Sequence, residues 1–206
     1  MVEARTEDDE LRIARALAIE AYAGVESALV VLLGRLLGTT NDLAAIVFFR
    51  ITNTSARNGI IEKLLEKAHG PKYDTYWHGQ PGAGAQRRIP GLFALIQQLD
   101  ERRKEIVHWH SRSSVSSTGD RWDDLVPAYH WARAPHLKPI TTPDLNAYIE
   151  KANFAQRSIF YFCQFTTKAP DVFMRAYGGE FETWESLFQQ PVPYPPSSNH
   201  PLAPKS

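Results

Sequence analysis

Cysteine is nearly absent from this chain, because Cys163 is the only one among 206 residues. A single cysteine allows no internal disulfide and no zinc site built from several thiolates. Cys163 lies in the apolar stretch 159–165, which contains three phenylalanines. This setting predicts a buried, unreactive thiol rather than a nucleophile. A reducing location is therefore expected.

Net charge and long hydrophobic runs are missing too. Lys plus Arg and Asp plus Glu both total 23, so the formal net charge is zero. Proteins that coat nucleic acid non-specifically are usually basic, so a nucleic-acid role would need a local patch. The longest strictly apolar runs, such as residues 28–33, are far shorter than the ~20 residues that span a bilayer. Residues 2–10 are polar and acidic, unlike a signal peptide. We expect a cytoplasmic protein.

Apolar residues recur at helical spacing in the first third of the chain and predict two long helices. The first spans about residues 9–37, and Gly38 ends it. The second spans about residues 42–69 and is capped by a side chain from residues 40–42. Gly59 lies inside this second helix, where glycine lowers helix propensity.

A third helix is expected at about residues 90–109, because Pro90 suits a first helical turn and apolar residues share one face. Residues 70–91, rich in glycine and proline, are expected to form a loop. Residues 111–143 begin with a Ser/Thr run and then become apolar. This pattern is typical of a short β-hairpin, with its turn at residues 118–120.

A fourth helix begins with Thr141 or Thr142 as its cap and ends before Pro170. A short amphipathic stretch follows at residues 181–188, and six prolines in residues 191–206 favour an extended, mobile tail. The predicted fold is all-α, a bundle of four to five helices with a small hairpin between the third and fourth. Its predicted parts are a bundle at residues 1–170, a short helical appendage at 171–190 and a flexible tail at 191–206.

Arginine and histidine gather where the third helix ends. Residues 102–110 read Arg-Arg-Lys-Glu-Ile-Val-His-Trp-His. Metal-independent RNA cleavage needs a base for the 2′-hydroxyl, an acid for the leaving 5′-oxygen and a cation for the phosphate. Histidine suits both proton transfers because its ordinary pKa lies near neutrality. Arginine keeps its charge and offers a planar set of donors to phosphate oxygens.

This segment resembles the HEPN family of small helical-bundle proteins, whose signature is Arg, four to six residues, then His, near a helix end. Arg103 and His108 match it with a four-residue spacer, preceded by the aliphatic pair Ile106-Val107. The resemblance covers about residues 9–168, but only this segment is diagnostic. The chain departs from the family at Lys104, where Asn is common, and at His110, where toxin members often carry Tyr.

The resemblance implies a metal-independent endoribonuclease in a prokaryotic toxin–antitoxin or antiviral defence system. It also implies a homodimer in which two copies of the motif meet in a composite cleft. No metal or other cofactor is expected. The implied partners are RNA and an antitoxin or other defence-system protein, with no membrane.

The pairing of arginine and histidine stays open. We expect Arg103 and His108 to be catalytic, with Arg102, His110 and Lys104 as auxiliaries, although Arg102 to His108 and Arg103 to His110 also satisfy the spacing. On a regular helix, Arg103 shares a face with His110 and not with His108. Either the helix unwinds near His108, or the two histidines face different partners.

Other residues are weaker candidates. Trp109 is expected to stack on a base and Arg112 to contact phosphate, although a dimer interface would explain Trp109 as readily. Glu20 is expected to orient an Arg or His across the bundle. His130 and His136 have no carboxylate spacing that supports a metal site.

Two rival hypotheses remain. One is a non-catalytic dimeric module that binds RNA, a nucleotide or a partner protein. The other is an unrelated bundle with a chance Arg/His pair.

Overall fold

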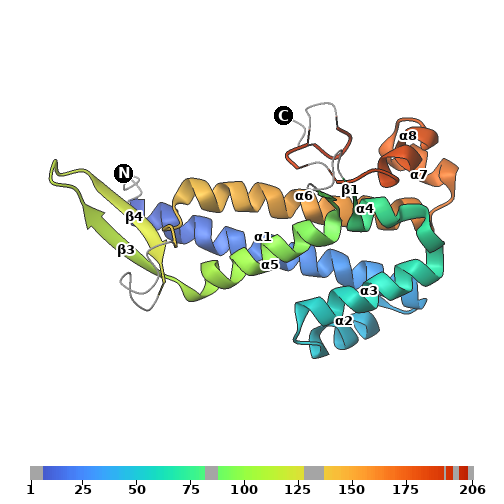
Figure 1. The fold of residues 1–206 in the computed structure, drawn as a ribbon, viewed down its shortest axis with the longest axis horizontal. Helices are drawn as coiled ribbons and strands as arrows, with labels where there is room; N and C mark the ends of the chain where they lie inside the picture. The colour runs from blue at the N-terminus through green and yellow to red at the C-terminus, as the bar shows by residue number, and fades with distance from the viewer. Residues whose placement is uncertain (1–6, 82–87, 128–136, 193, 197–199, 204–206) are drawn as a thin grey trace, which may run out of the picture.

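The computed structural model describes residues 7–81, 88–127, 137–192, 194–196 and 200–203. These residues form a mostly helical structure with two small antiparallel sheets (Figure 1). Three long helices run along one another, with the second of them in the opposite direction (Figure 1). They are α1 (Glu7–Leu37), α5 (Leu92–His108) and α6 (Thr142–Thr167).

The remaining elements surround the two ends of these helices. Helices α2 (Asn41–Arg50) and α3 (Thr54–His69) lie on one side, and the hairpin of β3 (His110–Val115) and β4 (Arg121–Val126) projects from the opposite end (Figure 1). The expected hairpin is therefore confirmed, with Gly119 at a positive φ of 90° in its turn.

The interior lies mainly between α1 and α6. The buried residues of α1 follow helical spacing, and several of them are alanines that let α6 approach closely. Gly24 also lies at this contact, since a Cβ there would lie 2.8 Å from the Gln156 side chain. Cys163 of α6 is fully buried, as expected, and burial raises the pKa of its thiol.

The α1 helix is also long and apolar enough, by length and composition, to cross a membrane. Its most apolar stretch, within residues 8–37, has a mean hydropathy of 1.8 and is 50 % buried inside the protein. A helix at the core of a folded domain meets the same criterion because its inner stripe is apolar.

The second predicted helix, 42–69, is wrong as a single rod. It breaks at residues 51–53 and not at Gly59, which lies within α3. Ile51 ends α2 in an extended conformation, and the Asn53 side chain accepts a hydrogen bond from the Ala56 N–H at 3.0 Å to begin α3. Side chains that cap backbone groups compete with helix continuation, and this polar Thr-Asn-Thr run supplies them.

The predicted loop at residues 70–91 is also wrong in part. It holds a 3₁₀ turn (Gly70–Tyr73), the short helix α4 (Asp74–His78), and strands β1 (Gly79–Pro81) and β2 (Arg88–Pro90). The cause is aromatic burial: Tyr76 and Trp77 are each 2 % exposed and pack on Phe162 of α6.

Two glycines allow the chain to cross itself beside these aromatics. A Cβ on Gly91 would lie 2.3 Å from the Gly79 N and 2.5 Å from the Trp77 O. Gly79 itself has a φ of 80°, in the left-handed region. Only glycine fits this crossing, which sets where α5 begins.

The C-terminal part packs onto the same interior. Thr141 caps α6 in a capping box with Asp144, and α6 ends before Pro170 as predicted. Helices α7 (Pro170–Tyr177) and α8 (Phe181–Phe188), in the segment predicted as a helical appendage, bury aromatic side chains against α6. In the segment expected to be a mobile tail, Val192 and Leu202 are 6 % and 1 % exposed and join the core.

Candidate functional site

The end of α5 is held in place by an arginine from α1. Arg15 donates through Nε to the Ile106 carbonyl at 2.9 Å, and through Nη2 to the carbonyls of Val107 at 2.9 Å and Trp109 at 2.7 Å. The last carbonyls of a helix have no later N–H partner within it, and a cation near them is favourable. Arg15 therefore fixes the backbone that carries His108.

Arg103 and His108 do not meet within one chain. Helix α5 stays regular through His108, so the two side chains are about 140° apart around its axis. The Arg103 guanidinium turns toward α1, where it lies 4.8 Å from the centre of the Tyr22 ring. His108 is exposed, as is His110, which already belongs to β3. The unwinding considered above does not occur, and helical spacing no longer relates Arg103 to His110.

A buried carboxylate organises the residues around Arg103. Asp100 is 2 % exposed, and it accepts hydrogen bonds from Tyr22 Oη at 3.1 Å and Arg103 Nη2 at 3.3 Å, and contacts Lys104 Nζ at 2.8 Å. Burial alone would raise the pKa of Asp100. Hydrogen bonds from Lys104 and Tyr22 outweigh that effect and hold the pKa below its ordinary value. Sequence analysis missed Asp100, although its place three and four residues before two cations was a usable signal.

A second buried ion pair lies beside the first. Arg57 of α3 is 7 % exposed, donates to Glu26 Oε1 of α1 at 2.9 Å, and stacks 4.5 Å from the centre of the Phe48 ring. Glu26 therefore links α1 to α3. Glu20, the residue expected to provide such support, is exposed on the outer side of α1.

A cleft of about 810 Å³ opens between α3 and α5. One end is polar, where the start of α3 faces the charged half of α5. The other end is aromatic and is formed by Trp77, His78 and Phe93. The polar lining consists of Thr52, Asn53, Thr54, Ser55, Asn58, Glu62, Gln97, Asp100, Glu101, Arg103 and Lys104.

The cleft contains polar atoms without a protein partner. Trp77 is 2 % exposed, and its Nε1 has no hydrogen-bond partner within the described part of the chain. The same holds for Asn58 Oδ1 and Arg103 Nε. Leaving a buried donor or acceptor unsatisfied costs about 1–3 kcal/mol. A polar ligand or solvent in the cleft would relieve this cost.

The outer stripe of α5 leads from the cleft to His108. Gln97, Glu101 and Lys104 line the cleft, and His108 comes four residues after Lys104. Residues four apart on a helix are surface neighbours, with about 5–6 Å between their Cβ atoms. Lys104, whose side chain is 58 % exposed, is thus the cation that neighbours His108.

The predicted RNA-binding residues Trp109 and Arg112 and the auxiliary Arg102 make other contacts. Trp109 is 8 % exposed and belongs to the core, so its ring offers no free face to a base, contrary to expectation. Arg112 makes two hydrogen bonds to Asp124 across the hairpin, at 3.1 and 2.7 Å. Arg102 pairs with Glu105.

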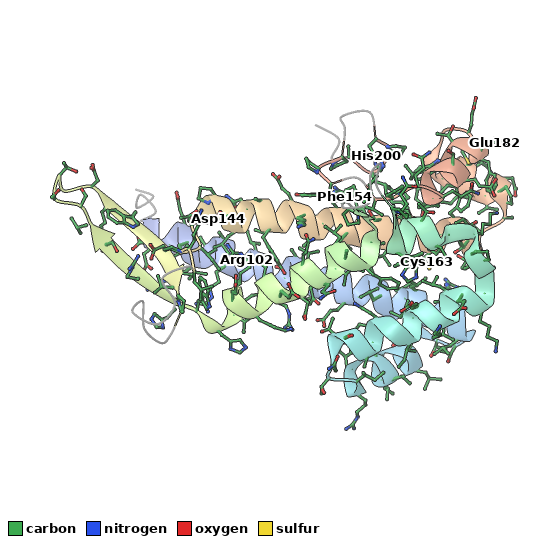
Figure 2. The ribbon with its side chains drawn as sticks, viewed as in Figure 1. Arg102, Asp144, Phe154, Cys163, Glu182 and His200 are labelled. Atoms are coloured by element: carbon green, nitrogen blue, oxygen red, sulfur yellow. The ribbon has the colours of Figure 1, made fainter. Side chains whose placement is uncertain are left out.

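Arg102 also lies near Asp144, at the start of α6 (Figure 2). Burial alone would raise the pKa of Asp144, but hydrogen bonds from Thr141 and the charge of Arg102 lower it. Each lysine and arginine described within residues 102–112 therefore forms an ion pair with a carboxylate. The segment is less basic than its composition predicts.

Some expectations fall outside the described residues, namely those on His130 and His136. Among the residues that are described, no group of three His, Cys, Asp or Glu side chains could hold a metal ion. Comparison with protein-family models, curated proteins and solved structures finds no match for this chain.

Proposed function

We propose that the chain is a metal-independent endoribonuclease of the HEPN type, acting as a cytoplasmic homodimer in a prokaryotic defence or toxin role. Its regulatory partner is an antitoxin or another defence-system protein. One observation carries the proposal: the exposed imidazole of His108 stands on a backbone fixed by Arg15, next to Lys104 at the edge of a polar cleft. The mostly helical fold, with this segment closing a long helix, supports the HEPN-type bundle.

The reaction is a transfer of the phosphodiester within the RNA. His108 takes the proton of a 2′-hydroxyl, and the 2′-oxygen then attacks phosphorus. The bond to the 5′-oxygen breaks, and the exposed imidazole of His110, two residues further along the chain, returns a proton to that oxygen. The products are a 2′,3′-cyclic phosphate and a 5′-hydroxyl. Lys104 and Arg103 stabilise the charge that develops on the phosphate.

The cleft suits a single strand of RNA. The hydroxyl and amide side chains at the start of α3, together with its first backbone N–H groups, are donors for phosphate and ribose oxygens. The aromatic end provides ring contacts for a base, with Phe93 partly exposed there. A strand in this cleft passes Lys104 and reaches His108.

The test is cleavage of single-stranded RNA in the presence of EDTA, with analysis of the ends. We expect 2′,3′-cyclic phosphate ends, and a loss of about 10²–10⁴-fold for His108→Ala, the range for removal of a general acid or base. Lys104→Ala should cleave more slowly, while Lys67→Ala, an exposed lysine late in α3, serves as its matched control. Undiminished cleavage by His108→Ala would refute the site.

A non-catalytic module that binds RNA or a nucleotide in the same cleft is the second candidate. The lining of the cleft favours it, because His108 is not among the residues that line the cleft, whereas polar and aromatic side chains are. This candidate predicts that the purified protein retains labelled RNA on a filter and leaves it intact. Binding that persists in His108→Ala but falls in Lys104→Ala would support this alternative.

A further inference from the structure

Helix α2 turns large apolar side chains outward. Only Ala44 and Phe48 of this helix are buried. Its outer face is formed by Leu43, Ile46, Val47 and Phe49, which are 55, 61, 45 and 56 % exposed. In Figure 1, α2 lies on the outside of the bundle beside α3. Burying such side chains stabilises by about 1.5–3 kcal/mol each, so this α2 outer face has a strong tendency to find a partner.

The arrangement differs from the other exposed apolar residues of the chain. On α1, Ile13 and Leu17 are exposed one turn apart on the same face, but the exposed Ile19 points elsewhere, and the charged residues Arg12 and Glu20 separate it from them around the helix. Single exposed apolar side chains are ordinary on protein surfaces, whereas a contiguous patch marks an interface. The α2 outer face is such a patch.

The charges around the patch identify its partner. Asp42 stands at its beginning and Arg50 at its end, eight residues or about 12 Å apart along the helix. Ile46 lies midway between them. An antiparallel copy of α2 that crosses at Ile46 brings Asp42 opposite Arg50 and Leu43 opposite Phe49. The surface is therefore complementary to itself about a twofold axis, as an isologous interface requires.

We infer that α2 is a self-association surface that joins two copies of this chain by antiparallel α2–α2 packing about Ile46. A membrane surface fits the patch less well, because one cation and one anion flank it instead of a cluster of cations. An interface with a different protein would not require Asp42 and Arg50 to be placed symmetrically about the middle of the patch, whereas an interface with a second copy does.

The position of α2 connects this interface to the cleft. Residues 51–53 follow α2 directly, and Thr52 and Asn53 line the cleft. Thr52 lies two residues beyond the end of α2, so each cleft begins close to the proposed interface. The interface thus holds two clefts on either side of one axis. Their joint use on RNA rests on the proposed function, whereas the self-association does not.

The experiment measures molar mass in solution, by light scattering on a sizing column and by sedimentation over a range of concentrations. The unmodified chain should be a dimer. Ile46→Glu, which places two carboxylates at the axis, should be a monomer with unchanged helical content. Ile13→Glu on α1 is the matched control and should remain a dimer. A monomeric unmodified chain, or a dimer that survives Ile46→Glu, overturns the inference.

Charge exchange tests the geometry itself. Asp42→Arg leaves both ends of the patch positive and Arg50→Asp leaves both negative, so each variant alone should dimerise at least tenfold more weakly. A mixture of the two should form a heterodimer, and the double variant should regain the original affinity. Both substitutions also act on the α2 dipole, but that effect cannot make the mixture associate. No heterodimer in the mixture refutes the antiparallel arrangement.

Cleavage assays on the same proteins separate the two proposals. A chain that dimerises through α2 but leaves RNA intact contradicts only the proposed function. A chain that cleaves RNA but stays monomeric contradicts the inference about α2, together with the homodimer of the proposed function.

Discussion

The stability of the bundle near the site should depend on Asp100. Asp100→Asn keeps the shape of the side chain but removes its charge. Its NH₂ group, itself a donor, then faces either Lys104 alone or the two donors Arg103 and Tyr22. Removing one partner of a buried ion pair costs about 3–5 kcal/mol. The side chains of Lys104 and Arg103 are 58 and 32 % exposed, so solvent screens part of that loss. We expect a decrease of about 2–3 kcal/mol in the free energy of unfolding.

The effect should depend on pH in a defined direction. The pKa of Asp100 is lower in the folded protein than its ordinary value. Its charge therefore stabilises the fold fully above the ordinary carboxyl pKa of about 4, and this contribution is lost as pH falls through the folded value. The difference between the unmodified chain and Asp100→Asn should be constant above about pH 5 and shrink below about pH 4.

Urea unfolding followed by circular dichroism, repeated from neutral to acidic pH, measures both effects. Glu101→Gln is the matched control, because Glu101 is an exposed carboxylate on the same helix, and its variant should stay within about 0.5 kcal/mol of the unmodified chain. A loss below about 1 kcal/mol for Asp100→Asn at neutral pH would refute the role given to this carboxylate. A loss that does not diminish in acid would refute the lowered pKa.

Two further predictions concern the backbone around the site. Arg15→Ala removes three hydrogen bonds to the end of α5 and should cost about 2 kcal/mol. Amide hydrogen exchange should accelerate at residues 105–109 more than in α6, whereas Arg12→Ala should leave it unchanged. Gly91→Ala should lose at least about 3 kcal/mol or fail to fold, because its Cβ would meet backbone atoms. Gly59→Ala, with open space around it inside α3, should instead gain about 0.5–1 kcal/mol in thermal denaturation. A stable Gly91→Ala protein would contradict the close crossing with Gly79.

Local signals predicted the long elements well. The periodicity of apolar residues located α1, α5 and α6, and capping residues such as Thr141 placed the start of α6 within a residue. Periodicity could not reveal the break at residues 51–53, because apolar positions continue in register on both sides of it. The segment 70–91 was predicted as a loop because of its glycines and prolines. Its local sequence does not show that two of its aromatic side chains pack on α6.

The site was predictable only in its local part. The Arg/His motif located Arg103, Lys104 and His108 on one helix, yet their surroundings come from distant segments. Tyr22 reaches Asp100 across 78 positions of sequence, and Arg15 reaches Trp109 across 94. A short sequence motif gives no information on contacts with such distant segments. The pairing of each cation with a carboxylate was hidden for the same reason, and it changes what the motif can do.

The two cations that face Asp100 differ in how easily they can turn to a phosphate. Arg103 contacts both Asp100 and the Tyr22 ring, so turning it toward a phosphate would break two interactions. Asp100, which also binds the Tyr22 hydroxyl, would then lose one of its donors. If Lys104 moves, Asp100 keeps Tyr22 and Arg103 as donors. A flexible lysine also delivers its charge without a fixed donor geometry. Lys104 is therefore the group expected to follow the phosphate past His108, while Arg103 stays in place against Asp100 and the Tyr22 ring. On this argument, Arg103→Lys should impair RNA cleavage less than Lys104→Ala does.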